Sequence, residues 1–184
     1  PVNPNGLKTD YLWKDTLTKE SLSNIIENYA QIVEETDEDT GKVKRKLIFP
    51  RYHQLRVVKK LLGNSKENGV GQKYLIQHSA GSGKSNSITW LAHQLVSLHN
   101  IANTETVFDS VIVVTDRKVL DKQIRDNIKQ FAQVNKVVEA IEKGSKQLKE
   151  ALEDGKKIIV TTVQKFPFII DEIGTLQAKK FAII

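Results

Sequence analysis

The sequence predicts an α/β domain with a mostly parallel sheet that is flanked by helices. Three observations lead to this fold class. Helix-like and strand-like segments alternate from residue 49 onward. The segments 111–114 and 158–160 are continuous apolar runs, as expected of strands covered on both faces. A Gly-Ser-Gly-Lys-Ser run at 81–85 lies between an expected strand and an expected helix, which is typical of nucleotide-binding α/β domains.

Composition narrows the possible functions. The 184 residues fit one domain, or one domain with an attached fragment. The chain has no Cys, which excludes disulfides, Cys-ligated zinc and a thiol nucleophile. No apolar run reaches the ~18 residues of a spanning helix, so no membrane partner is expected. With 28 basic and 22 acidic residues the net charge is +6, which favours a polyanionic partner such as nucleic acid. Because the chain begins at Pro1 and contains no Met, we expect a processed or excised piece.

Residues 1–48 are expected to connect to the main domain, which spans 49–184. Apolar residues at helical spacing predict a helix over 21–33. Acidic residues then dominate 34–39 and basic residues dominate 42–46, with turn-forming residues between the two blocks. The two blocks could pair as a hairpin with opposite charges facing each other, or they could form a solvated linker. The sequence leaves both interpretations open.

The main domain alternates between the two element types. Helical spacing of apolar residues and a following Gly63 predict that its first helix ends at residue 62. In chain order, the expected elements are helix 51–62, loop 63–72, strand 74–76, helix 84–98, strand 111–114, a helix around 120–131, strand 137–138, helix 145–152, strand 158–160 and the start of a strand at 181–184.

The most informative stretch is 77–85, which reads Gln-His-Ser-Ala-Gly-Ser-Gly-Lys-Ser. Its glycines let the backbone curl so that successive N–H groups point at phosphate oxygens. The helix that begins near Lys84 adds the positive end of its dipole. Lys84 would reach the β- and γ-phosphates, and the Ser85 hydroxyl would bind magnesium. The loop therefore predicts a site for ATP and magnesium, formed by Gly81, Ser82, Gly83, Lys84 and Ser85.

One position departs from the general phosphate-loop pattern, which has Gly where this chain has His78. Many helicase-type NTPases relax this position, so the difference indicates a subclass. We interpret His78 as a structural residue at the end of the expected strand.

No catalytic residue is expected within the chain. Asp171 and Glu172 follow an apolar run, but Pro167 precedes that run. The run also follows the strand at 158–160 too closely for a crossover between parallel strands. We therefore expect this acidic pair on a helix end or loop, and the catalytic acid just beyond Ile184.

The chain resembles the R subunit (HsdR) of type I restriction enzymes, in which a nuclease domain precedes two RecA-like motor domains of helicase superfamily 2. The motifs that carry the resemblance are Phe-Pro-Arg-Tyr-His-Gln at 49–54, the loop at 77–85, Val-Val-Thr-Asp-Arg at 113–117 and Ile-Val-Thr-Thr-Val-Gln-Lys-Phe at 159–166. The resemblance runs from about residue 11 to 184. It implies a first RecA-like domain at 49–184 that ends before its Asp-Glu-Ala-His box, and a connection from an absent nuclease domain at 1–48.

The resemblance also implies roles for single residues. Arg51 and Gln54 match the family's adenine-reading element, and a Gln amide suits the Hoogsteen edge of adenine. Hydroxyls and helix N-termini at strand ends suit phosphate contacts with DNA. An alternative for Asp116 is an N-cap of the helix that follows it. The residues implied to line the DNA track are Thr115, Asp116, Arg117, Thr161 and Thr162.

The activity that the resemblance implies is translocation of double-stranded DNA, driven by ATP and magnesium and coupled to DNA cleavage. The implied partners are the modification (M) and specificity (S) subunits, in a prokaryotic cytoplasm, and this chain alone is expected to be inactive. Two alternatives stay open. One is another superfamily 2 helicase or translocase, such as a repair helicase or a chromatin-type remodeller. The other is a phosphate-loop binding module without turnover.

Overall fold

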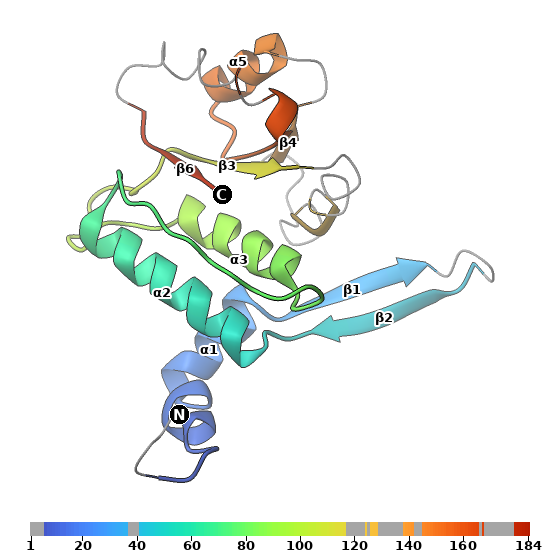
Figure 1. The fold of residues 1–184 in the computed structure, drawn as a ribbon, viewed down its shortest axis with the longest axis vertical. Helices are drawn as coiled ribbons and strands as arrows, with labels where there is room; N and C mark the ends of the chain where they lie inside the picture. The colour runs from blue at the N-terminus through green and yellow to red at the C-terminus, as the bar shows by residue number, and fades with distance from the viewer. Residues whose placement is uncertain are drawn as a thin grey trace. The chain divides into compact units, whose positions relative to one another are not determined.

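The chain divides into two compact units, Pro1–Arg51 and Tyr52–Ile184, and each is described by itself. The computed structural model (Figure 1) describes residues 6–36, 41–116, 124, 126–128, 138–141, 145–165, 167 and 179–184. No helix in these described ranges is long and apolar enough to cross a membrane.

The described part of the first unit contains two helical segments followed by a hairpin. It holds the π-helix η1 (Leu12–Thr16), helix α1 (Lys19–Asn28) and strands β1 (Gln31–Thr36) and β2 (Val43–Ile48). Thr18 caps α1, because its hydroxyl oxygen accepts the Ser21 N–H at 3.3 Å. The helix predicted over 21–33 is too long, since α1 ends at Asn28 and β1 begins at Gln31.

The hairpin settles the two interpretations of the charged blocks in favour of paired strands. β1 and β2 are antiparallel, with Glu34 opposite Arg45 and Glu35 opposite Lys44. The Glu34 and Arg45 side chains form an ion pair at 2.9 Å. Because both side chains are exposed, this pair contributes under ~1 kcal/mol to the free energy of unfolding. Its main effect is to favour the strand register in which opposite charges face each other.

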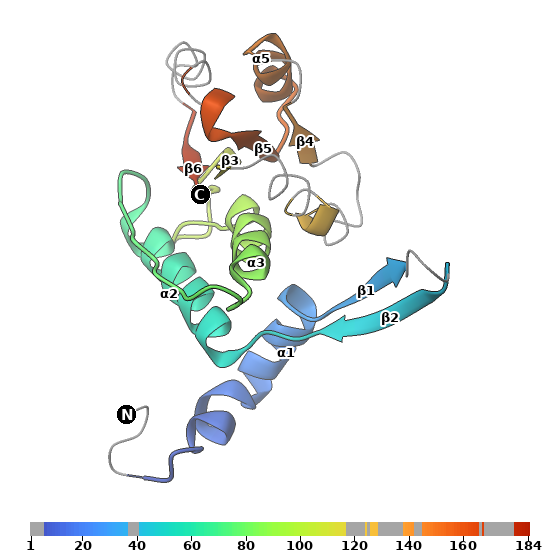
Figure 2. The same ribbon diagram turned by 45° about the vertical axis from the view of Figure 1, so that its right-hand side comes forward.

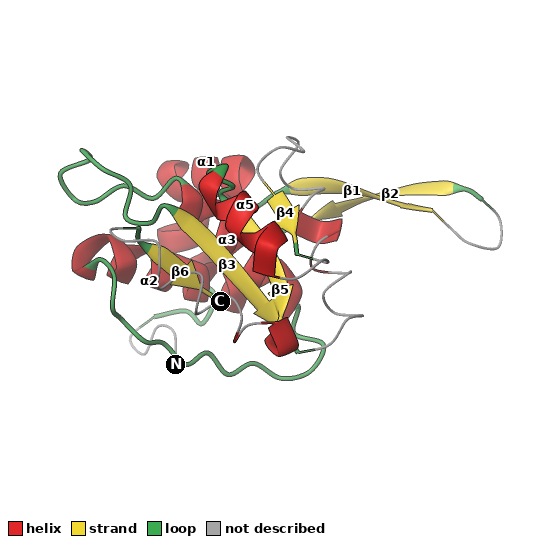
Figure 3. Ribbon diagram, turned by 90° about the horizontal axis from the view of Figure 1, so that it is seen from above, coloured by secondary structure: helices red, strands yellow, loops and turns green. Residues whose placement is uncertain are grey.

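The second unit is built on a four-stranded parallel sheet. Its strands are β4 (Val138–Ala140), β5 (Ile158–Thr162), β3 (Ser110–Thr115) and β6 (Phe181–Ile183), in that spatial order. Every neighbouring pair is parallel, and β3 lies between β5 and β6 (Figure 3). β3 and β5 are buried along their length except for half-buried Val114. The predicted fold class, an α/β domain with a parallel sheet, is confirmed.

Helices cover both faces of this sheet. Helix α2 (Tyr52–Asn68) packs against α3 (Lys84–Val96), and α3 packs against β3 and β5. Helix α5 (Ser145–Glu153) lies on the opposite side of the sheet from α3 (Figures 1 and 2). Its inner side chains form a core cluster with the sheet, made of Ile112, Ile141, Ala151, Leu152 and Ile159.

The end of α2 was predicted wrongly. The helix continues through Gly63 to Asn68, and the glycine that follows it is Gly69, with φ 66° and an N–H that donates to the Ser65 carbonyl at 3.0 Å. Gly63 sits on an open face, where nothing lies within 4 Å of an added Cβ. A helical Gly costs only about 1 kcal/mol relative to Ala, which the packing of α2 against α3 offsets.

The strand predicted at 74–76 is also wrong. Tyr74, Leu75 and Ile76 lie in an extended segment outside the sheet, and Leu75 is 95% exposed. A strand requires a neighbour that completes its ladder, and among the described residues no strand pairs with this segment. The Tyr74 hydroxyl donates to Asn64 Oδ1 at 2.6 Å, which ties the segment to α2 instead.

The other predicted elements occur within two residues of their expected bounds. These are α3, β3, β4, α5, β5 and β6. Of the helix expected around 120–131, the described residues 124 and 126–128 are helical. The pair Asp171 and Glu172 lies outside the described residues.

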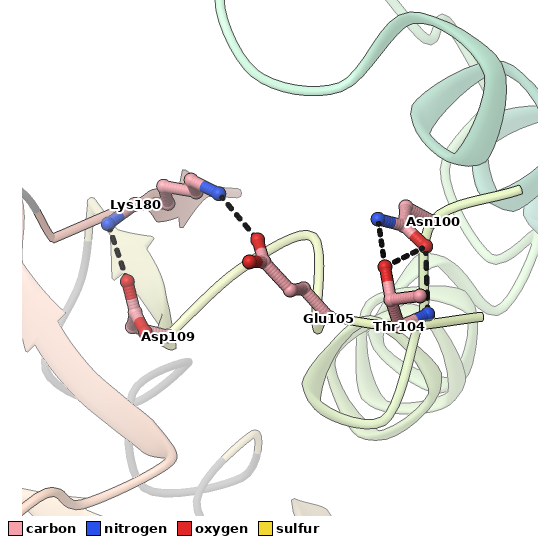
Figure 4. A network of polar contacts seen from close by, with 5 residues as sticks. All are labelled: Asn100, Thr104, Glu105, Asp109 and Lys180. Atoms are coloured by element: carbon pink, nitrogen blue, oxygen red, sulfur yellow. Dashed lines mark hydrogen bonds and ion pairs between the residues drawn. The ribbon is translucent and has the colours of Figure 1, made fainter. Parts of the chain in front are cut away.

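A polar contact brings β6 beside β3 across a long stretch of chain (Figure 4). The Lys180 N–H donates to Asp109 Oδ2 at 2.6 Å, and the Asp109 N–H donates to the Lys180 carbonyl at 2.7 Å. The Lys180 ammonium also lies 3.6 Å from Glu105. These contacts precede both strands, so they set the register in which Ser110 faces Phe181.

His93 joins α3 to the helical residues 126–128. Its Nε2 donates to the Ile128 carbonyl at 3.1 Å, and Ile128 is fully buried. Burial lowers the pKa of His93 below its usual 6.5, because desolvation opposes the charged ring. The carbonyl bond acts in the other direction and offsets only part of this shift.

Candidate functional site

The loop 78–83 leads directly into α3 and is shaped by two glycines. Gly81 has φ 71°, and Gly83, the N-cap of α3, has φ 82°; both angles are strained for other residues. The Gly83 carbonyl accepts the N–H groups of Asn86 and Ser87 at 3.1 and 3.3 Å, which begins the helix. The remaining N-terminal N–H groups of α3 have no partner within the helix, and they form a positive helix end that favours an anion.

Lys84 lies at this helix end with its side chain exposed. Its ammonium donates to the carbonyls of His78 at 3.2 Å and Ser79 at 2.9 Å. The Lys84 side chain, which follows the loop in sequence, therefore reaches back across it to its first residues. A phosphate oxygen would offer Lys84 a charge-assisted bond about twice as strong as one to a neutral carbonyl. A phosphate group can thus replace these loop carbonyls as the partner of Lys84.

Ser82 and Ser85 supply the hydroxyls of the site. Ser82 Oγ is buried, and the described part of the chain provides no hydrogen-bond partner for it. Ser85 is half-buried in the first turn of α3, where its carbonyl accepts the Thr89 hydroxyl at 3.0 Å. A hydroxyl oxygen is a suitable ligand for Mg²⁺. The described residues contain no group of three or more His, Cys, Asp or Glu side chains that could hold a metal. Ser85 could hold a magnesium ion together with phosphate oxygens and water.

Gln54 lies against the loop from the first turn of α2. The side chain is buried, and its Nε2 donates to the carbonyls of Ser82 at 3.3 Å and Gly83 at 2.9 Å. A Cβ at Gly83 would lie 2.4 Å from this nitrogen, so Gly at this position is what permits the contact. The structure thus brings Gln54 to the phosphate loop, and its adenine-reading role stays a prediction. Arg51 ends the first unit as an exposed residue, and its role likewise stays a prediction.

His53 is a site residue that the sequence reasoning missed. Its Nε2 lies 3.1 Å from the Ser82 carbonyl, and its ring meets the ring of His78 edge-on at a centroid distance of 5.1 Å. His53 directly precedes Gln54 in the first turn of α2, so adjacency to a predicted site residue was the available signal. His78 is part of the same contact, but the strand that it was expected to end is not formed, and its structural role stays a prediction.

Three of the predicted DNA-track residues, Thr115, Thr161 and Thr162, lie together at the carboxyl ends of two neighbouring strands. Thr115 and Thr162 are paired at the carboxyl ends of β3 and β5, and Thr161 lies one position earlier. All three side chains are buried, the Thr115 hydroxyl donates to the Thr161 carbonyl at 3.4 Å, and Asp116 is exposed. Burial favours a structural part for these hydroxyls, and the DNA role stays a prediction. Arg117 lies outside the described residues, as does the start of the helix that Asp116 would cap.

Comparison with known proteins identifies the family. No curated protein matches the chain. The family model of the SWI2/SNF2 ATPases matches residues 53–184, which include the loop, all of α2 except Tyr52, α3 and the parallel sheet. An ATPase family implies the use of a nucleotide, usually with Mg²⁺, which agrees with the geometry of the loop. The chain belongs to the SWI2/SNF2 ATPase family, a group of motors like those of helicase superfamily 2.

Proposed function

We propose that this chain binds ATP with magnesium at the loop 78–85 and is part of a DNA-translocating motor. The observation that carries the proposal is the position of Lys84, whose ammonium is held 2.9 Å from the Ser79 carbonyl at the positive end of α3. A cation, a helix N-terminus and two left-handed glycines are found together there, a combination that favours a phosphate group.

Each residue of the loop has a distinct part in this proposal. The backbone N–H groups between Gly81 and Ser85 bind phosphate oxygens, and Lys84 neutralises the terminal phosphates. Ser85 holds magnesium, which when bound offsets negative charge on the phosphates. Gln54 keeps the loop in place through its two carbonyl contacts and is proposed to read adenine.

The proposed substrate track is double-stranded DNA along the carboxyl ends of β3 and β5. Ligands of open parallel sheets bind outside this edge, where Thr115, Asp116, Thr161 and Thr162 are found. The net charge of +6 supports a polyanionic partner. Arg117 completes the proposed track as its cation.

The finer assignment is the R subunit of a type I restriction enzyme. It is supported by the motifs at 49–54, 113–117 and 159–166, which resemble that subunit. The proposed partners are then the M and S subunits in a prokaryotic cytoplasm, and DNA cleavage belongs to a nuclease domain. A second candidate is a chromatin-type remodelling motor, which the SWI2/SNF2 family match favours. A third is a nucleotide-binding module without turnover. It is supported by the burial of Thr115, Thr161 and Thr162, because buried hydroxyls are poorly placed to contact DNA.

Nucleotide binding is tested by Lys84→Ala with titration calorimetry, using a non-hydrolysable ATP analogue and magnesium. A bound nucleotide would cover the Lys84 ammonium, and truncating one partner of a charge pair that is buried in this way weakens binding by roughly 2–5 kcal/mol. Lys66→Ala is the matched control, because Lys66 is an exposed lysine in the last turn of α2. Equal affinities for wild type and Lys84→Ala would remove the loop from the proposed site.

The restriction assignment is tested by affinity purification of the tagged chain from its own cells, followed by mass spectrometry. Recovery of DNA-modification and specificity subunits supports the type I enzyme. Recovery of chromosomal packaging proteins in their place favours the remodelling motor.

Filter binding of a random 40-base-pair duplex, measured over a salt series, tests the DNA contact, and salt-independent binding would contradict a phosphate track.

A further inference from the structure

The first turn of α2 places two adjacent side chains on one carbonyl of the phosphate loop. The Ser82 carbonyl lies 3.1 Å from His53 Nε2 and 3.3 Å from Gln54 Nε2. A carbonyl oxygen only accepts hydrogen bonds and has two lone pairs, so it can take both donors. His53 Nε2 must therefore carry the hydrogen in this contact.

Fixing this carbonyl also fixes a donor of the loop. The peptide unit is planar and trans, so the Ser82 carbonyl and the Gly83 N–H point in opposite directions from one rigid group. With the carbonyl held toward α2, the Gly83 N–H is directed away from α2. Backbone N–H groups at this point of a phosphate loop are the ones that contact phosphate oxygens.

His53 also contacts the start of the loop. Its ring lies at 86° to the ring of His78, an edge-to-face arrangement that is favourable for aromatic rings. His78 begins the loop, and Ser82 lies directly before the N-cap of α3. One side chain thus touches both ends of the curled segment, by a ring contact at one end and a hydrogen bond at the other.

We propose that His53 is a positioning residue for phosphate binding: it holds the Ser82–Gly83 peptide in the orientation that presents its N–H to the nucleotide, and His78 supports its ring. The inference rests on the proposed nucleotide-binding function. It differs from a base-reading role, because an effect on the peptide orientation acts on the phosphates and is independent of the base. His53 therefore changes the affinity for every ligand that carries the same phosphates.

Two variants separate the hydrogen bond from the ring contact. His53→Phe keeps a ring against His78 but cannot donate to Ser82, whereas His53→Gln provides an amide donor in roughly the place of Nε2. The probes are ATP, GTP and inorganic tripolyphosphate, each with magnesium, titrated by calorimetry. The control is His99→Phe, since the His99 ring lies beyond the far end of α3 and contacts the Ser97 carbonyl.

We expect His53→Phe to weaken the binding of all three ligands by the same factor, about three- to tenfold, as for the loss of one hydrogen bond. His53→Gln should recover most of this loss, and the unliganded melting temperature shows that each variant is folded. Unchanged affinities in His53→Phe would overturn the inference, as would a loss confined to ATP. If the wild-type chain binds none of the three ligands, the proposed function itself fails and the inference fails with it.

Discussion

At the scale of the residue, the loop contacts of Gln54 and its proposed adenine-reading role would compete for one amide. Its Nε2 already donates to the Ser82 and Gly83 carbonyls at 3.3 and 2.9 Å, while the resemblance implies that it reads adenine. A nucleotide that draws the amide toward its base would loosen these loop contacts. The proposed adenine contact would thereby link binding of the base to the shape of the loop 78–83 through a single side chain.

Gln54→Ala is expected to weaken ATP and GTP unequally. Loss of the loop contacts lowers both affinities by about 0.5–1.5 kcal/mol, and loss of the adenine contact lowers only the ATP affinity further. The measurement is calorimetric titration with each nucleotide, with the exposed Gln72→Ala as control. If both affinities fall while their ratio stays constant, Gln54 only positions the loop and the adenine role is wrong.

At the scale of the element, the phosphate loop depends on a close approach between two segments. Gly81 and Gly83 share a left-handed backbone, but only at Gly83 would a Cβ meet another side chain, at 2.4 Å from Gln54 Nε2. Around Gly81 nothing lies within 4 Å of an added Cβ. The two glycines therefore form a matched pair that separates backbone strain from loss of the contact with α2.

Both Gly81→Ala and Gly83→Ala should lower stability by the ~1–2 kcal/mol cost of a left-handed residue with a Cβ. Gly83→Ala should lower it further, because the buried Gln54 amide must move and leave the loop carbonyls. Urea unfolding of the nucleotide-free variants measures the difference. Equal losses in the two variants would show that the Gln54 contact contributes nothing to the stability of the loop.

Helix α3 carries a pH-sensitive contact in His93. Its pKa is lowered in the fold, so the unfolded chain binds a proton more readily than the native chain. The stability that comes from neutral His93 is complete above the unfolded pKa of about 6.5 and is lost as the pH falls toward the lower folded pKa. We therefore expect acidification to destabilise the fold where His93 of α3 contacts the Ile128 carbonyl.

The test compares wild type with His93→Gln, which can still donate to the Ile128 carbonyl but does not titrate. We expect the unfolding free energy of wild type to fall more steeply than that of the variant between about pH 7 and 5. All other titrating groups are shared, so the difference between the two slopes isolates His93. Parallel slopes would mean that His93 protonation is not linked to folding.

At the scale of the whole molecule, the sequence predicted those elements whose formation depends on a local pattern of residues. Continuous apolar runs indicated β3 and β5, and the Gly-Lys-Ser loop indicated the start of α3. What it did not predict depends on neighbours distant in the chain. Whether 74–76 becomes a strand depends on a pairing partner that no local pattern specifies. The place of β6 beside β3 depends on contacts between Asp109 and Lys180, which are 71 residues apart.

The site shows the same division between local and distant information. The loop was proposed as a phosphate site from its own residues, because glycines and a lysine at that spacing are typical of a phosphate-binding loop. The contact of His53 with Ser82 was not predicted. The two residues are 29 positions apart, and the packing of α2 against α3 brings them together. Side chains that support a loop from another element carry no periodic signal.

The last prediction concerns the chain as a whole and uses its stability as the reporter. A nucleotide that binds only the folded state stabilises it by about 2.7 kcal/mol at a hundredfold excess over the dissociation constant. For a domain of this size the melting temperature rises by about 2–4 °C per kcal/mol. The melting temperature should therefore rise steadily with the logarithm of ATP concentration in the presence of magnesium, by roughly 5–10 °C at that excess. Differential scanning fluorimetry measures this rise, which chelation of magnesium should reduce and Lys84→Ala should largely abolish. A rise of the same size in Lys84→Ala would place the nucleotide elsewhere on the molecule, and no rise at any concentration would contradict a folded nucleotide site in this chain.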